Sequence, residues 1–408
     1  MTRRDAGRRI APVALLMLLF ALLASAGNAL AAAAGAPRIA VATMLPGEIF
    51  FERFGHNAIV VDDPAAGTTT AYNFGFFDPG EADFTGRFVR GDMRYRLIAL
   101  PLEQDLAYYR EVGRGVTLQW LDLDDAQARR LAAMLAENAK PENAAYRYDY
   151  FTDNCSTRVR DALDAVLDGG LRRQLQARSQ GNTFRSESVR LARPAWWMRW
   201  GFDIGLGPAA DRPNALWDDA FVPMRLAAAL RDVRLADGRP LVGAEQTLLP
   251  QRLPAEPEPR AQPWWPWLLA GLAGAGLLLW AGGRDPRFVA RVALPAWVAC
   301  ALLGTVSLFI WLGTDHRFGW ANRNLLLLSP LCWALLPGAW RIARGGDGGG
   351  PFRWLLALVA ALALLAPFLL WLPLQPQRNA HWIALLLPLQ CAFAWVLLRA
   401  PRRARAPD

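Results

Sequence analysis

The sequence predicts an α+β domain followed by an all-α membrane domain. Strand-like segments rich in β-branched and aromatic residues dominate from residue 35 to about Leu123, and helical patterns dominate afterwards. Beyond Pro263 the apolar residues form long runs, each near the ~20 residues that a bilayer core requires. The chain has 408 residues, 53% of them hydrophobic, and the excess lies in those runs.

The first residues have the pattern of a secretory signal peptide. Four arginines stand among the first nine residues, and an apolar run follows from Ile10 to about Leu23. Ala29-Leu-Ala31 offers a cleavage site, so we expect residues 1–31 to direct export of the chain. If cleavage did not occur, this segment would remain as an N-terminal anchor.

Residues 35–254 are expected to form the exported domain. Strands are predicted for the segments beginning at Phe54, Thr68 and Met93, each of which is rich in β-branched or aromatic residues. Helices are predicted from Asp124-Asp125 to Pro141 and from Asp153-Asn154 to Gly169-Gly170. Residues 255–263 are rich in proline and are expected to be a stiff linker to the membrane domain.

Five membrane spans are predicted within residues 264–400, at about 264–281, 289–312, 324–341, 353–372 and 381–399. Arginine is concentrated in residues 283–291, 341–344 and the basic tail 401–408, which predicts that these segments are cytoplasmic. The large domain then lies on the opposite side. Because these arginines account for part of the net charge of +9, that charge does not indicate nucleic-acid binding, and no nucleic-acid module is visible.

His56 and Cys155 are the only histidine and the only cysteine between residues 35 and 254. Cys155 is expected in the first turn of a helix, where the partial positive charge favours a thiolate, and His56 is expected on a strand. A cysteine on a helix beside a histidine on a strand is typical of a papain-like thiol site. The alternative is that both are ordinary buried side chains.

Asn73, on the neighbouring predicted strand, is the first candidate to orient the imidazole, with Tyr72 and Glu48 behind it. Asp153 and Asn154 are candidates for substrate binding, although both would serve equally well as helix caps. Outside the exported domain, His316, Asn322 and Asn324 form a polar group at the predicted outer membrane edge, where they would either assist a lipid substrate or simply belong to an interfacial loop. Arg185 and Asp203 would either bind a lipid headgroup or fix loops together, and we favour the second, structural role.

No metal site or cofactor is expected. One histidine and one cysteine in the exported domain do not supply the usual zinc ligands, and no HExxH spacing occurs. Neither a phosphate-binding glycine loop nor a dinucleotide fingerprint is present.

These motifs together resemble the Lnb N-terminal periplasmic domain family of lipoprotein N-acyltransferases. The resemblance rests on the segments around His56, Asn73 and Cys155, on residues 197–223, and on residues 314–326 in the membrane part. It implies a circularly permuted papain-like (NlpC/LRAT-like) fold, because the histidine strand precedes the cysteine helix. It also implies a bacterial inner-membrane protein with a periplasmic domain.

The resemblance further implies a cysteine-dependent acyltransferase that moves an acyl chain from a lipid ester, through a thioester on Cys155, to a lipoprotein. Its partners would be the bilayer and a membrane lipid or lipoprotein. Two other functions remain open from the residues alone. The domain could be a thiol hydrolase that cleaves a lipid ester or a cell-wall peptide, or a non-catalytic envelope protein that binds a partner.

Overall fold

The computed structural model describes residues 35–370 and 376–400. The predicted signal peptide, the basic tail and the end of the fourth predicted span lie outside these residues. The chain divides into two compact units, each made of segments that are distant in sequence. Within the described residues, the first unit contains 35–77, 94–177 and 220–254, and the second contains 78–93, 178–219 and 255–400.

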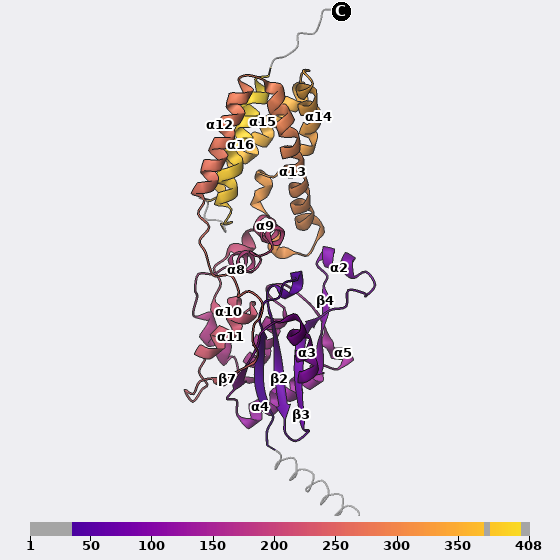
Figure 1. The fold of residues 1–408 in the computed structure, drawn as a ribbon, viewed down its shortest axis with the longest axis vertical. Helices are drawn as coiled ribbons and strands as arrows, with labels where there is room; N and C mark the ends of the chain where they lie inside the picture. The colour runs from indigo at the N-terminus through magenta and orange to yellow at the C-terminus, as the bar shows by residue number, and fades with distance from the viewer. Residues whose placement is uncertain (1–34, 371–375, 401–408) are drawn as a thin grey trace, which may run out of the picture. The chain divides into compact units, whose positions relative to one another are not determined.

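The first unit is built on one antiparallel sheet of seven strands, which confirms the α+β class. In spatial order the strands are β6 (Ala145–Arg147), β4 (Arg94–Pro101), β3 (Thr68–Phe76), β2 (His56–Asp63), β1 (Arg38–Met44), β5 (Val116–Leu121) and β7 (Val242–Leu249). The three strands predicted near residues 54, 68 and 93 are therefore present as β2, β3 and β4. Figure 1 shows these strands within the first unit.

Helices complete the first unit. They are η1 (Phe50–Glu52), α3 (Leu102–Val112), α4 (Asp125–Asn138), α5 (Pro141–Ala144), α6 (Cys155–Val166), α7 (Gly170–Gln176) and α11 (Pro223–Asp232). Helix α4 begins after Asp124, whose carboxylate accepts from the Gln127 N–H, as the sequence predicts. Strand β7 was not anticipated, because it is a mostly exposed edge strand without an alternating apolar face.

The two faces of the sheet have different partners. Alternate residues of β1 and β2, including Ala42 and Val60, pack in one cluster with Leu106 and Tyr109 of α3. Since successive strand residues point to opposite faces, the intervening residues face the other way, and there Asn57 contacts α6. His56 shares the parity of Val60 and therefore lies on the α3 face.

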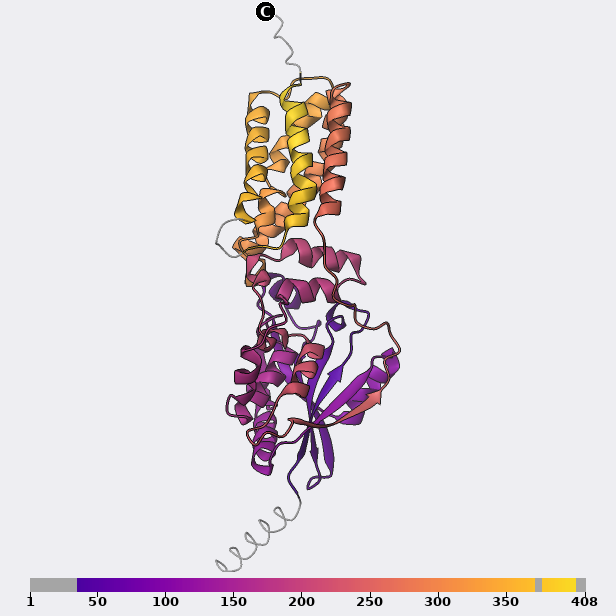
Figure 2. The same cartoon turned by 90° about the vertical axis from the view of Figure 1, so that its left-hand side faces the viewer.

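The second unit contains the apolar helices. Its elements are α2 (Phe84–Arg90), α8 (Phe184–Leu191), α9 (Trp196–Gly205), η2 (Pro208–Asp211), α10 (Leu216–Asp219), α12 (Trp265–Gly282), α13 (Pro286–Gly313), η3 (Arg317–Gly319), η4 (Arg323–Leu326), α14 (Cys332–Ala343), α15 (Gly350–Leu365), η5 (Phe368–Leu370) and α16 (Ala380–Leu398). Figure 2 shows the long helices of this unit running side by side. Four helical segments among the described residues are long and apolar enough to cross a membrane: Trp265–Gly282, Pro286–Gly313, Gly350–Leu370 and Ala380–Leu398.

The third predicted span, 324–341, is not one continuous helix. It consists of the short η4, a turn through Ser329-Pro330, and the 12-residue α14. Pro330 interrupts the helix because proline disfavours helical geometry in the residue before it. At ~1.5 Å per residue, α14 is roughly 18 Å long, well short of the ~30 Å bilayer core.

The non-helical part of this segment obtains its hydrogen bonds from side chains. Gln390 Nε2 donates to the Leu327 carbonyl at 3.2 Å, and the Arg323 N–H donates to Gln377 Oε1 at 2.8 Å. Irregular backbone at membrane depth requires such partners, because lipid offers none.

Candidate active site

Cys155 is the first residue of α6, where the sequence predicts it. Asn154 forms the N-cap, and its side chain accepts from the Thr157 N–H at 2.9 Å while Thr157 Oγ1 accepts from the Asn154 N–H at 2.7 Å. Val159, Leu163 and Val166 form the buried face of the helix. The cap and this apolar face together fix where the helix begins, and hence where the thiol lies.

The start of α6 is tied directly to the histidine strand. Ser156 Oγ lies 2.8 Å from Asn57 Oδ1, and Asn57 Nδ2 donates to Thr43 Oγ1 at 2.9 Å. The Cys155 sulfur also interacts with the backbone N–H groups of Asn57 and Ser156. The thiol is therefore held beside residue 57, the chain neighbour of His56.

A glycine precedes the histidine for a steric reason. Gly55 has φ +79°, and a Cβ there would lie 2.8 Å from Met224 Sδ and 2.9 Å from the Met44 carbonyl oxygen. Any other residue would be strained and would push the strand away from its neighbours. Glycine at position 55 thus allows β2 to begin at His56 in contact with its neighbours.

Asn73 contacts the imidazole. His56 Nε2 and Asn73 Oδ1 are 3.0 Å apart, and Asn73 Nδ2 donates to Asp105 Oδ2 of α3 at 3.3 Å. Because a carboxylate only accepts hydrogen bonds, Asp105 holds the amide with its oxygen toward His56. Nε2 must then carry the ring proton, which leaves Nδ1 free to act as a base.

Asp105 was not anticipated from the sequence, although one signal was available. It lies on the buried face of α3 with Leu106 and Tyr109. A carboxylate on the apolar face of an amphipathic helix needs a buried polar partner, and that partner could be identified only once β3 was placed against α3.

Burial controls the acid–base state of both reactive groups. Burial lowers the pKa of His56 to about 4, opposed in part by the hydrogen bond to Asn73. Burial also raises the pKa of the Cys155 thiol, and the backbone N–H groups of Asn57 and Ser156 work in the opposite direction. At neutral pH the resting pair is therefore a neutral thiol and a neutral imidazole.

Arg114 is a second unanticipated residue of the site. It is buried, its Nη1 lies 3.3 Å from Glu52 Oε1, and its Nε donates to the Leu45 carbonyl at 2.9 Å. Its charge lowers the pKa of both Cys155 and His56. Arg114 thus favours a thiolate while it disfavours an imidazolium, which keeps the imidazole available as a base.

The two predicted substrate-binding residues before Cys155 have structural partners. Asn154 Nδ2 donates to the Tyr150 and Phe221 carbonyls at 2.8 and 2.9 Å, in addition to the capping contact. Asp153 forms a bidentate ion pair with Arg158. These contacts fit the cap and loop roles and leave little free capacity for a ligand.

The predicted polar group of the second unit is also engaged. His316 Nε2 lies 3.0 Å from the Phe88 carbonyl of α2. Asn322 Nδ2 donates to the carbonyls of Ile204 and Gly205, at 2.7 and 3.1 Å, and Asn324 Nδ2 donates to that of Ile204 at 3.0 Å. The two buried amides therefore satisfy carbonyls at the C-terminal end of α9.

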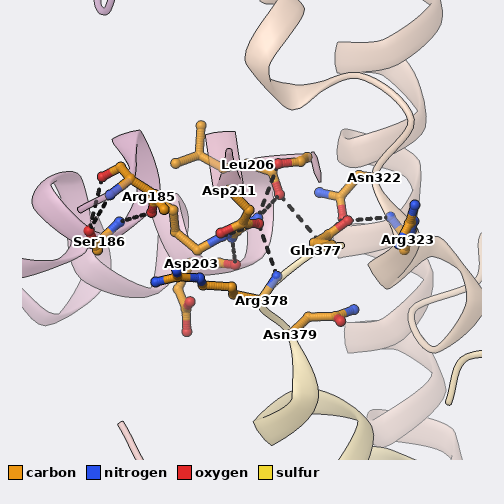
Figure 3. A network of polar contacts seen from close by, with 12 residues as sticks. Arg185, Ser186, Asp203, Leu206, Asp211, Asn322, Arg323, Gln377, Arg378 and Asn379 are labelled. Carbon is orange, nitrogen blue, oxygen red and sulfur yellow. Dashed lines mark hydrogen bonds and ion pairs between the residues drawn. The ribbon is translucent and has the colours of Figure 1, made fainter. Parts of the chain in front are cut away.

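Figure 3 shows the larger polar network to which Asn322 belongs. Arg185 Nε contacts both carboxylate oxygens of Asp211 at 2.9 Å, and its Nη1 donates to the Asp203 carbonyl at 2.6 Å. His381 Nε2 lies 2.8 Å from Asp203 Oδ2. The network fixes loops of the second unit, which is the structural role expected for Arg185 and Asp203.

The state of the resting thiol can be tested by its alkylation. Because the partly exposed thiol is neutral, the rate of Cys155 alkylation by iodoacetamide should rise about tenfold per pH unit between about pH 6 and 8. Peptide mass spectrometry of the full-length protein in detergent would measure this rate at Cys155 alone. The reaction of iodoacetamide with glutathione at each pH would serve as the control for the reagent. A rate that is flat across the range would instead indicate a preformed thiolate–imidazolium pair.

Asn322→Ala separates a structural from a substrate-binding role. The substitution removes the donor to the Gly205 carbonyl and the acceptor of Gln377 Nε2, and a buried polar group without a partner costs about 1–3 kcal/mol. The thermal unfolding temperature of the full-length protein should fall, whereas Glu258→Ala, at an exposed position of the same unit, should leave it unchanged. An unaltered unfolding temperature would contradict the structural role.

Comparison with known proteins finds one similarity, to a protein family. Residues 33–191 match the family model of the Lnb N-terminal periplasmic domain. No curated protein and no solved structure matches the chain. The matched segment contains His56, Asn73 and Cys155, and it is followed in the chain by four apolar helices long enough to cross a membrane. Residues 33–191 are thus a domain of the Lnb N-terminal periplasmic family.

Proposed function

We propose that this protein is a membrane-anchored thiol acyltransferase, with Cys155 as nucleophile, His56 as general base and acid, and Asn73 as the orienting residue. The observation that carries the proposal is the contact of His56 Nε2 with Asn73 Oδ1 at 3.0 Å, in a domain whose thiol begins a helix bonded to the same strand. Papain-like enzymes combine a cysteine, a histidine and an asparagine in these roles. A permuted papain-like fold is part of the proposal.

The reaction proceeds in two steps. In the first, His56 Nδ1 takes the thiol proton as the Cys155 sulfur attacks the carbonyl carbon of a lipid ester; the carbon–oxygen bond then breaks, and His56 returns the proton to the leaving alcohol. In the second, the amine of a lipoprotein N-terminal cysteine attacks the thioester. The carbon–sulfur bond then breaks as His56 moves the amine proton to the sulfur, which yields the amide and the free Cys155 thiol; the lyso-lipid is the alcohol that left in the first step.

Exposed apolar residues support a lipid as the acyl donor. Ile49, Phe50, Phe51 and Phe76 are exposed, Phe51 to 55%, and Phe51 packs edge-on against Phe77 at 5.4 Å between ring centroids. Phe76 directly follows Gly75, whose backbone lies against Cys155. Exposed apolar side chains suit an acyl chain better than the polar groove expected of a peptidase. The four apolar helices would give the enzyme access to membrane lipids.

The direct test is mass spectrometry of lipoprotein N-termini from bacteria that lack their own N-acyltransferase. Cells expressing this protein should contain an N-acylated lyso-lipoprotein, and cells expressing Cys155→Ala should not. His56→Ala should behave like Cys155→Ala, because without a base the neutral thiol is a poor nucleophile. Unmodified N-termini despite normal expression of the wild-type protein would contradict the acyltransferase and favour a hydrolase.

We also propose that the membrane domain makes five crossings, the third being the broken segment that ends in α14. An odd number of crossings puts the basic C-terminal tail in the cytoplasm, as the arginine distribution predicts. Green fluorescent protein fused after Asp408 should then fluoresce, and alkaline phosphatase fused there should be inactive. The reverse pattern would indicate four crossings and place the tail on the periplasmic side.

A further inference from the structure

One polar atom beside the cysteine has no role so far. The hydroxyl oxygen of Tyr146 is buried, and it has no hydrogen-bond partner among the described residues. Leaving a buried hydroxyl unpaired costs about 1–3 kcal/mol. Native proteins seldom keep such a group unless a ligand or reaction intermediate completes its bonding.

The hydroxyl and the cysteine border the same small space. Gly75 has φ +94°, and a Cβ built on it would lie 3.6 Å from Cys155 Cβ and 3.8 Å from the Tyr146 hydroxyl oxygen. The missing side chain of Gly75 therefore leaves room between the two. An acyl carbon bonded to the sulfur would bring its oxygen into this neighbourhood.

The ring of Tyr146 is held in place from two sides. Strand β6 pairs with β4, which sets Tyr146 opposite Tyr95. On its face, Arg158 lies 4.1 Å from the ring centroid, and Arg158 is itself fixed by the bidentate pair with Asp153. The ordering of Asp153 and Arg158 thus serves to position the tyrosine.

The Tyr146 hydroxyl keeps its proton, and so remains a hydrogen-bond donor, at neutral pH. Burial raises the pKa of Tyr146 well above its ordinary value, and the negative charge of a Cys155 thiolate raises it further. A neutral phenol in a buried site donates a hydrogen bond and keeps its proton.

We infer that the Tyr146 hydroxyl is the side-chain donor of the oxyanion hole, stabilising the tetrahedral intermediate formed on Cys155. This inference rests on the proposed thiol acyl-transfer function. The backbone N–H groups of Asn57 and Ser156 interact with the sulfur in the resting state. The phenol is a donor that the resting site leaves unused, so its hydrogen bond forms only when the oxyanion does, and such a bond lowers the barrier.

Tyr146→Phe tests this with two reagents that both react at Cys155. Acylation by p-nitrophenyl butyrate passes through an oxyanion, whereas alkylation by iodoacetamide does not. For the full-length protein in detergent, we expect Tyr146→Phe to reduce the rate constant of the Cys155-dependent, single-turnover release of p-nitrophenolate by about 10²–10³-fold. Alkylation of Cys155 should remain within about twofold of wild type, because the thiol itself is unaltered.

Two controls complete the experiment. Tyr72, which the sequence offered as a second candidate to orient the imidazole, pairs with Ile59 and so lies on the sheet face opposite to His56 and Asn73. Tyr72→Phe should therefore change neither rate. Cys155→Ala defines the background release. The phenylalanine variant should be as thermally stable as wild type, since the hydroxyl that it loses has no partner to leave unpaired.

Each of three other outcomes would overturn the inference, and each would have a different cause. Equal acylation by wild type and Tyr146→Phe would exclude the hydroxyl from the oxyanion hole while leaving the thiol chemistry intact. A parallel loss of acylation and alkylation would show that Tyr146 acts on the thiol or on its surroundings. Absence of Cys155-dependent release by the wild-type protein would remove the proposed function, and the inference with it.

Discussion

The proposed chemistry depends first on the hydrogen bond between His56 Nε2 and Asn73 Oδ1. This bond places the ring proton on Nε2 and leaves Nδ1 as the only basic nitrogen. Asp105 gives the bond its direction, because its carboxylate accepts from the Asn73 amide. The contact depends in turn on the register of β2 and β3 and on the packing of α3 over them. Elements that are distant in sequence therefore fix the orientation of the His56 imidazole.

Burial keeps both His56 and Cys155 uncharged in the resting protein. Burial makes the His56 imidazole hard to protonate and the Cys155 thiol hard to ionise, because it disfavours the charged form of each. The resting pair is consequently uncharged and less exposed to oxidation than a thiolate. Arg114, itself paired with Glu52, supplies a positive charge that lowers both pKa values. In the proposed mechanism, this arrangement favours proton transfer during the attack over a permanent ion pair.

The sequence predicted the local parts of the site well, because local rules determine them. Asp153 and Asn154 before an apolar-periodic run marked the start of α6 and put Cys155 in its first turn. β-branched residues marked β2. The roles of Asp105, Arg114 and Tyr146 could not be predicted, since each depends on pairings between elements that are distant in the chain.

In the membrane domain, composition alone was misleading in one place. Residues 324–341 are apolar enough for a span, yet Ser329-Pro330 breaks the helix and neighbouring glutamines satisfy the exposed backbone. Asn322 and Asn324 were expected either to assist a lipid substrate or to belong to an interfacial loop, and their amides bind the carbonyls at the end of α9. In both cases the decisive partners lie on segments far away in sequence.

Capture of the acyl-enzyme tests the central claim most directly. The purified full-length protein would be incubated with diacylated lipoprotein or phospholipid vesicles in the absence of an amine acceptor and then digested for mass spectrometry. We predict that the peptide containing Cys155 gains the mass of one acyl chain, that neutral hydroxylamine removes it, and that Asn73→Ala lowers its yield. A Cys155 peptide that stays unmodified with every lipid offered would contradict the account.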